Sequence, residues 1–68
     1  MVNIIEENLR ITIYLIDKER NFKKEISMYY VPCSGSEIML NNGNFEVQKV
    51  VLATFGSVAY LHGVLRVS

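Results

Sequence analysis

The stretch from Val31 to Ala53, VPCSGSEIMLNNGNFEVQKVVLA, decides the fold of this chain. It opens with a proline and a loop of turn-forming residues, and a short alternating run follows at Ile38–Leu40. Asn42-Gly43 then stands between two alternating apolar runs, which is the strongest short-range signal for a β-hairpin. The stretch therefore predicts a bend, a short strand, a tight turn and a longer strand.

Strand patterns flank this hairpin on both sides. Before it, Leu9–Ile16 alternates between two faces, and Phe22–Tyr30 follows after the charged loop Asp17–Asn21. We expect this loop to lie in solvent, because it is too polar to be buried. After the hairpin, Val58–Val67 is the last predicted strand. Gly63 lies within it at a position that indicates a bend or a close backbone approach.

The longest apolar piece, Phe45–Phe55, contains a break in its alternation. Its first apolar residues share one face, but Lys49 falls on that same face. A β-bulge near Gln48-Lys49 would turn Val50 and Leu52 inward instead, and bulges bend small barrels toward closure.

An α-helix is the alternative for the same segment. Asn44 is a suitable N-cap, and Gly56 is a suitable left-handed residue after the last turn. The residues branched at Cβ argue against a helix, because branching restricts their rotamers there. These residues are Val47, Val50, Val51 and Thr54.

The combined patterns predict an all-β fold, with one domain over residues 1–68 and five to six antiparallel strands in a small, partly open barrel. A chain of 68 residues is near the lower limit at which a hydrophobic core alone suffices. Met1–Asn8 adds an edge strand or folds over the open end. The expected core residues are Leu9 or Ile11, Ile13, Ile26, Met28, Ile38, Leu40, Val47, Leu52, Leu61 and Leu65.

The spacing P-x-x-G-x-x-I-x-L, followed by a turn and F-x-V-x-x-V, resembles the centre of small SH3-like β-barrel proteins. Many of these are short, uncharacterised proteins of phages and bacterial mobile elements. The resemblance implies a non-enzymatic module, often one that binds a protein or another copy of itself. The chain lacks the acidic loop and the tryptophan of signalling SH3 domains, so we do not expect it to bind proline motifs. The residues that carry the resemblance are Pro32, Gly35, Ile38, Leu40, Phe45, Val47 and Val50.

The charge balance argues against nucleic acid as the main partner. Seven basic residues face seven acidic ones, whereas phosphate binding normally needs a clustered positive patch. The one basic cluster is interleaved with acidic residues, so weak nucleic-acid binding by a small barrel is kept as the alternative function. This cluster consists of Lys18, Arg20, Lys23 and Lys24.

Two features of the sequence indicate a cytoplasmic protein. Cys33 is the only cysteine, which excludes an intrachain disulfide and favours a reducing compartment. No signal-peptide pattern is visible at the N-terminus. The uncharged run Val50–Leu65 is shorter than the roughly 18 residues that a membrane-spanning helix needs, so we expect no membrane segment.

Candidate catalytic residues are few. Cys33 as nucleophile and His62 as base would need to lie within hydrogen-bond reach, with a third group to orient the base. One cysteine and one histidine are too few for a structural zinc site, which takes four such ligands. The glycine-containing segments lack the spacing that cradles phosphates. We therefore expect no enzymatic activity, no metal and no cofactor.

Tyrosine side chains mark a candidate recognition surface on the first two strands. If these strands pair through the charged loop, Tyr14 and Tyr29 lie on their outward face, with Arg10 nearby. Tyrosine and arginine are enriched at binding hot spots, because they combine a large contact area with polar groups. The alternative interpretation is that tyrosines simply suit strands.

The second half of the chain extends this surface. It carries little charge, and so small a barrel cannot bury both faces of its last two strands. Val51, Phe55, Val58 and Tyr60 should therefore stay partly exposed, and exposed apolar patches mark interfaces. The predicted function is a small protein-binding module, either forming a symmetric homodimer by strand addition or acting as an inhibitor or adaptor of a larger protein.

Overall fold

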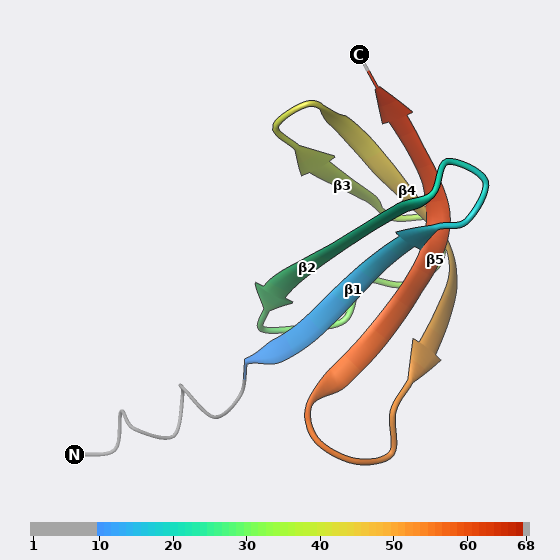
Figure 1. Cartoon of the computed structure of the whole chain (residues 1–68). Helices are drawn as coiled ribbons and strands as arrows, with labels where there is room; N and C mark the ends of the chain where they lie inside the picture. Colours follow the sequence, from blue (N-terminus) through green and yellow to red (C-terminus); the bar gives the residue numbers. More distant parts are fainter. Residues whose placement is uncertain (1–9, 68) are drawn as a thin grey trace.

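The computed structural model describes residues 10–67, which contain five β-strands and no helix (Figure 1). The strands are β1 (Ile11–Asp17), β2 (Phe22–Met28), β3 (Glu37–Leu40), β4 (Gly43–Leu52) and β5 (Val58–Val67). The all-β prediction is confirmed. The alternative helix over Phe45–Phe55 is wrong, because β4 takes most of that segment. The predictions for Met1–Asn8 and for Leu9 lie outside the described residues.

The strands form one sheet in the order β2-β1-β5-β4-β3. This sheet curls into an open half-barrel, with β2 and β3 as its outermost strands (Figure 1). The predicted partly open barrel is therefore confirmed.

The prediction of antiparallel strands is correct for three of the four pairs, but β1 and β5 are parallel. The reason lies in the connection between β2 and β3. It carries the chain away from β1, and the β3-β4-β5 meander then returns with its last strand alongside β1, running in the same direction. Such a pairing joins strands that are far apart in the sequence, so local alternation does not reveal it.

The core lies on the inner face of the curled sheet. Alternation brings the inward residues of β1, β4 and β5 together, and partly buried side chains from β2 and β3 pack against them. Most of the predicted core is therefore correct, with Leu15, Phe45 and Ala59 as additions. The buried core consists of Ile13, Leu15, Phe45, Val47, Ala59, Leu61 and Leu65.

The predicted β-bulge is present between Val47 and Lys49. Val50 then packs against the core as expected. Leu52 does not, because 62% of its surface is exposed. Leu52 pairs with the buried Ala59 and so lies on the inner face, but its predicted place in the core is wrong: β3 pairs with β4 only as far as Glu46 and does not extend alongside the end of β4.

Gly63 confirms the expected close backbone approach. It pairs with Val47 directly before the bulge. A Cβ atom at this position would overlap the carbonyl oxygen of Glu46 and lie 3.0 Å from Cε2 of Phe45. Only glycine therefore fits without moving β4 away from β5.

Asp17 corrects the expectation that the whole charged loop lies in solvent. It ends β1, and its side chain is only 3% exposed. Its Oδ2 accepts a hydrogen bond from the backbone N–H of Leu65 at 2.8 Å. The same oxygen forms an ion pair with the guanidinium of Arg20 at 3.1 Å. The Leu65 hydrogen bond is the main cause that lowers the pKa of Asp17, ahead of the contacts with Arg20. The buried carboxylate thus ties β1 to β5 beyond their last paired residues.

Candidate partner-binding surface

The outer face of the sheet brings four of the seven predicted partner-binding residues together. Tyr14 on β1 pairs in register with Tyr60 on β5, and Tyr60 pairs with Val51 on β4. These three side chains therefore form one row across three strands. Val58 lies in the next row on the same face, opposite Thr12.

The two tyrosine rings in this row are stacked. Their centroids are 5.4 Å apart and their planes differ by 17°. Adjacent strands lie roughly 4.8 Å apart, so rings in direct register meet face to face. The ammonium of Lys23 lies 5.3 Å from the Tyr14 centroid, at cation–π distance. The result is a half-buried aromatic surface at the middle of the sheet.

Arg10 and Tyr29 form a separate cluster at the start of β1. The Arg10 Nε donates a hydrogen bond to the Tyr29 hydroxyl at 3.4 Å, and the guanidinium carbon lies 5.4 Å from the ring centroid. Tyr29 is 62% exposed. Arg10 precedes Tyr14 by four residues, which is about 13 Å along a strand. The structure therefore joins Arg10 with Tyr29 and places this pair at a distance from the stacked tyrosines.

Phe55 lies in the turn between β4 and β5 and is 77% exposed. Leu52, just before this turn, is also largely exposed. Together with Val51 they form an apolar end of β4 that faces solvent on both sides of the sheet. The prediction for Phe55 and Val51 is confirmed as to exposure. Leu52 was missed, because its inward position in the alternation suggested burial.

Among residues 10–67, nothing pairs with one edge of β4 over its second half. Val47 donates to the carbonyl of Ser36 at 2.8 Å and accepts from Gly35 at 2.8 Å, so the loop before β3 occupies the edge at this point. The Ser34 hydroxyl donates to the carbonyl of Gln48 at 3.1 Å. Beyond Gln48, within residues 10–67, no strand or loop pairs with this side of β4. We call residues 49–52 the β4 edge.

The backbone geometry shows which groups of the β4 edge point outward. Ala53 donates to the carbonyl of Val58 at 3.1 Å, which marks a hydrogen-bonded pair between β4 and β5. Hydrogen-bonded pairs alternate along an antiparallel ladder, so Val51 also directs its N–H and C=O toward β5. The N–H and C=O groups of Val50 and Leu52 therefore point away from the sheet.

An apolar groove of about 460 Å³ lies beside the β4 edge. Its walls come from the loop before β3 and from the last half of β4, and they include Val31, Pro32, Cys33, Val50 and Leu52. We call this the apolar groove. An unpaired edge, an apolar groove and an exposed phenylalanine thus occur at one end of β4.

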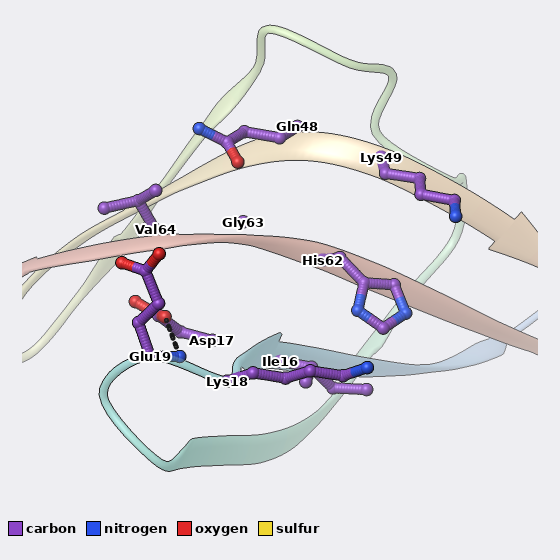
Figure 2. Close-up of a pocket in the computed structure, with 9 residues that line it drawn as sticks. All are labelled: Ile16, Asp17, Lys18, Glu19, Gln48, Lys49, His62, Gly63 and Val64. Atoms are coloured by element: carbon purple, nitrogen blue, oxygen red, sulfur yellow. Dashed lines mark hydrogen bonds between the residues drawn. The ribbon is translucent and has the colours of Figure 1, made fainter.

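A second hollow, of about 520 Å³, lies over β1, the bulge of β4 and β5. Figure 2 shows Lys18, Lys49 and His62 around it, with Glu19 and Asp17 on another side. The carboxylate of Asp17 already has hydrogen-bond partners within the chain, since its Oδ1 accepts a hydrogen bond from the Glu19 N–H at 3.1 Å. Charged side chains of both signs line the hollow but do not converge on one point. The lining therefore indicates no particular class of ligand.

The pair that sequence reasoning considered for catalysis is not assembled. Cys33 is exposed, and its Sγ lies 3.7 Å from the Ser36 hydroxyl. His62 lines the second hollow, whereas Cys33 lines the apolar groove. Among the described residues, no hydrogen bond joins Cys33 and His62. The His62 ring therefore does not contact the Cys33 thiol.

The described part of the chain gathers no group of three His, Cys, Asp or Glu side chains that would hold a metal ion. It also contains no helix long and apolar enough to cross a membrane. The basic cluster is partly neutralised, because Arg20 pairs with Asp17 at 3.1 Å and lies 3.7 Å from Glu19.

Comparison with protein-family models, curated proteins and solved structures gives no match for this chain. The resemblance to SH3-like barrel proteins, and to those of phages and mobile elements, therefore stays a prediction.

Proposed function

We propose that this protein is a small, non-enzymatic protein-binding module that associates with a second copy of itself. The observation that carries the proposal is the β4 edge, which no other described segment pairs with and which borders exposed apolar side chains. An exposed strand edge is a template for pairing with another chain unless charges, proline or a covering segment protect it.

The free edges of the sheet differ in this protection. The β2 edge carries three charged residues, Lys23, Lys24 and Glu25, which oppose pairing with another strand. The β4 edge carries only Lys49, followed by Val50, Val51 and Leu52. This contrast favours the β4 edge over the β2 edge as the one that receives a partner.

Side chains around this edge support an interface rather than a solvated surface. Phe55 and Leu52 are 77% and 62% exposed. The stacked Tyr14 and Tyr60 rings continue the surface from Val51 across the outer face. Large aromatic and apolar groups of this kind are typical of the centre of protein interfaces.

Light scattering on the purified full-length chain, at several concentrations, tests self-association. We expect the mass of a dimer, and we expect Phe55→Glu to give a monomer because a charge cannot be buried at the interface. Met39→Glu is the matched control, since Met39 is 84% exposed on β3 and away from the β4 edge. This control should remain a dimer.

A wild-type protein that is monomeric at every concentration would refute self-association. The partner of the β4 edge would then be a foreign chain, as expected for an inhibitor or adaptor. Dissociation of both glutamate variants would also count against the proposal, because it would show that the effect does not depend on the β4 edge.

A further inference from the structure

We infer that the second copy adds to the β4 edge as an antiparallel strand, about a two-fold axis at Val51, and that each copy inserts Phe55 into the apolar groove of the other. This inference rests on the self-association proposed above and specifies its geometry. It joins the features that occur at the end of β4 in one arrangement.

The outward backbone groups determine the register. A two-fold axis at Val51 places Val50 opposite Leu52 of the second copy, and these are the residues whose N–H and C=O groups point away from the sheet. Each Val50–Leu52 pair then exchanges both backbone hydrogen bonds, and the Val51 pair between them is a non-hydrogen-bonded pair. The alternation of an antiparallel ladder is thus satisfied without adjustment.

Neighbouring registers fit less well. An axis at Val50 would place Leu52 of the second copy opposite Gln48, where the loop before β3 already covers the edge through Ser34. An axis at Leu52 would require Thr54, which lies beyond the end of β4. The axis at Val51 uses only the free part of the strand.

Charge is compatible with the same axis. Lys49 comes to lie opposite Ala53, so no like charges oppose each other across the pair. An equivalent axis at the middle of β2 would place Glu25 directly opposite its own copy, and like charges in that position are destabilising. The β3 edge is only four residues long and begins with Glu37.

Phe55 lies beyond the paired residues of β4 in this register, so it comes next to the loop before β3, which occupies the edge at Val47 and walls the apolar groove. Contact between Phe55 and the apolar groove adds interface area that pairing of the two β4 strands alone would not provide. A stable interface buries about 800 Å² per partner, roughly a sixth of the 5084 Å² surface of the described residues. Reciprocal burial of Phe55 between Pro32 and Leu52 adds apolar contact on both sides of the axis.

Disulfide trapping tests the register. Facing residues of a non-hydrogen-bonded antiparallel pair have Cα atoms about 4.5 Å apart, which is within the range of a disulfide. In a Cys33→Ser background, Val51→Cys should therefore cross-link to its own copy under mild oxidation. Lys49→Cys is the matched control on the same edge, because its symmetry mate lies four residues out of register. We expect Val51→Cys to form the linked dimer at least about tenfold faster.

Amide hydrogen exchange provides a second measurement that needs no cysteine. In the dimer the amides of Val50 and Leu52 should exchange at least about tenfold more slowly than in the Phe55→Glu monomer. Equally slow exchange in the monomer would overturn the inference, since another part of the same chain would then cover the edge.

The outcomes separate the two proposals. A dimer in light scattering without preferential cross-linking at Val51 would overturn this register but leave self-association standing. A wild-type monomer would overturn both. Cross-linking at Val51, together with weakening of the dimer by about tenfold to a hundredfold in Phe55→Ala, would support the arrangement.

Discussion

Gly63 is the position where the structure predicts the sharpest loss of stability from a single methyl group. It pairs with Val47 at the bulge that bends β4 around the core. In Gly63→Ala the new Cβ would overlap the carbonyl oxygen of Glu46 and press against the ring of Phe45. Both neighbours are fixed, because one is backbone and the other is a fully buried side chain.

The magnitude follows from what must move. Relieving the overlap requires β4 to separate from β5 at the centre of the core, and overpacking of this kind costs about 3 kcal/mol or somewhat more. A chain of 68 residues has a total stability of roughly 3–10 kcal/mol. The substitution therefore removes about a third of the stability at least, and lowers the melting temperature by about 12–24 °C.

Gly56→Ala is the matched control. Gly56 has φ +63°, which disfavours alanine, but the nearest side-chain atom, Cγ2 of Val58, lies an ordinary 3.8 Å from the added Cβ. Its cost should be about 1–2 kcal/mol. The comparison thus sets a steric overlap against a backbone preference, with the same change of residue.

Urea unfolding followed by circular dichroism measures both losses. The measurement is best made in the Phe55→Glu background, because the stability of a dimer depends on protein concentration. Gly63→Ala should lose at least about 1 kcal/mol more than Gly56→Ala, and failure to fold would agree with the larger estimate. Equal losses would show that the two strands are not packed as closely as the structure describes.

Three further predictions concern other parts of the molecule. The pKa of Asp17 lies below its ordinary value of 3.8, so its ionised form stabilises the fold above that pH and loses this effect as the pH falls through the lowered pKa. Asp17→Asn should therefore lower the melting temperature most near neutral pH, and a pH-independent difference would contradict this. A double-mutant cycle with leucine at Tyr14 and Tyr60 should give a coupling of about 0.5–1.5 kcal/mol, whereas no coupling would refute the stack. Fluorescence anisotropy should show at most weak DNA binding that falls steeply with salt; sub-micromolar affinity at physiological salt would favour the alternative function.

Much of the fold could be predicted from local alternation. The bounds of Val58–Val67 agree with β5, and the bulge could be located because Lys49 breaks the alternation of its strand. Both features depend on residues that are close in the sequence. The alternation of apolar and polar residues along a strand is therefore sufficient to show both features.

The features that could not be predicted depend on contacts between distant residues. The hydrogen bond from Leu65 to Asp17 joins positions 48 residues apart, and no local pattern marks that aspartate as buried. The stacking of Tyr14 on Tyr60 follows from the parallel register of β1 and β5. Sequence reasoning placed both tyrosines on a surface, but it could not bring them together without that pairing.

A difference in strand length links the errors about the core to the proposed interface. β3 has four residues and β4 has ten, so β3 covers only the first part of its neighbour. Within the described part of the chain, the remainder of β4 leaves Leu52 exposed and the outward N–H groups of Val50 and Leu52 without a backbone partner. A neighbouring strand would satisfy those groups, and burial of Leu52 and Phe55 would accompany it. In the proposed dimer, the short length of β3 therefore both leaves the barrel incomplete and leaves the second half of β4 to pair with a strand of the second copy.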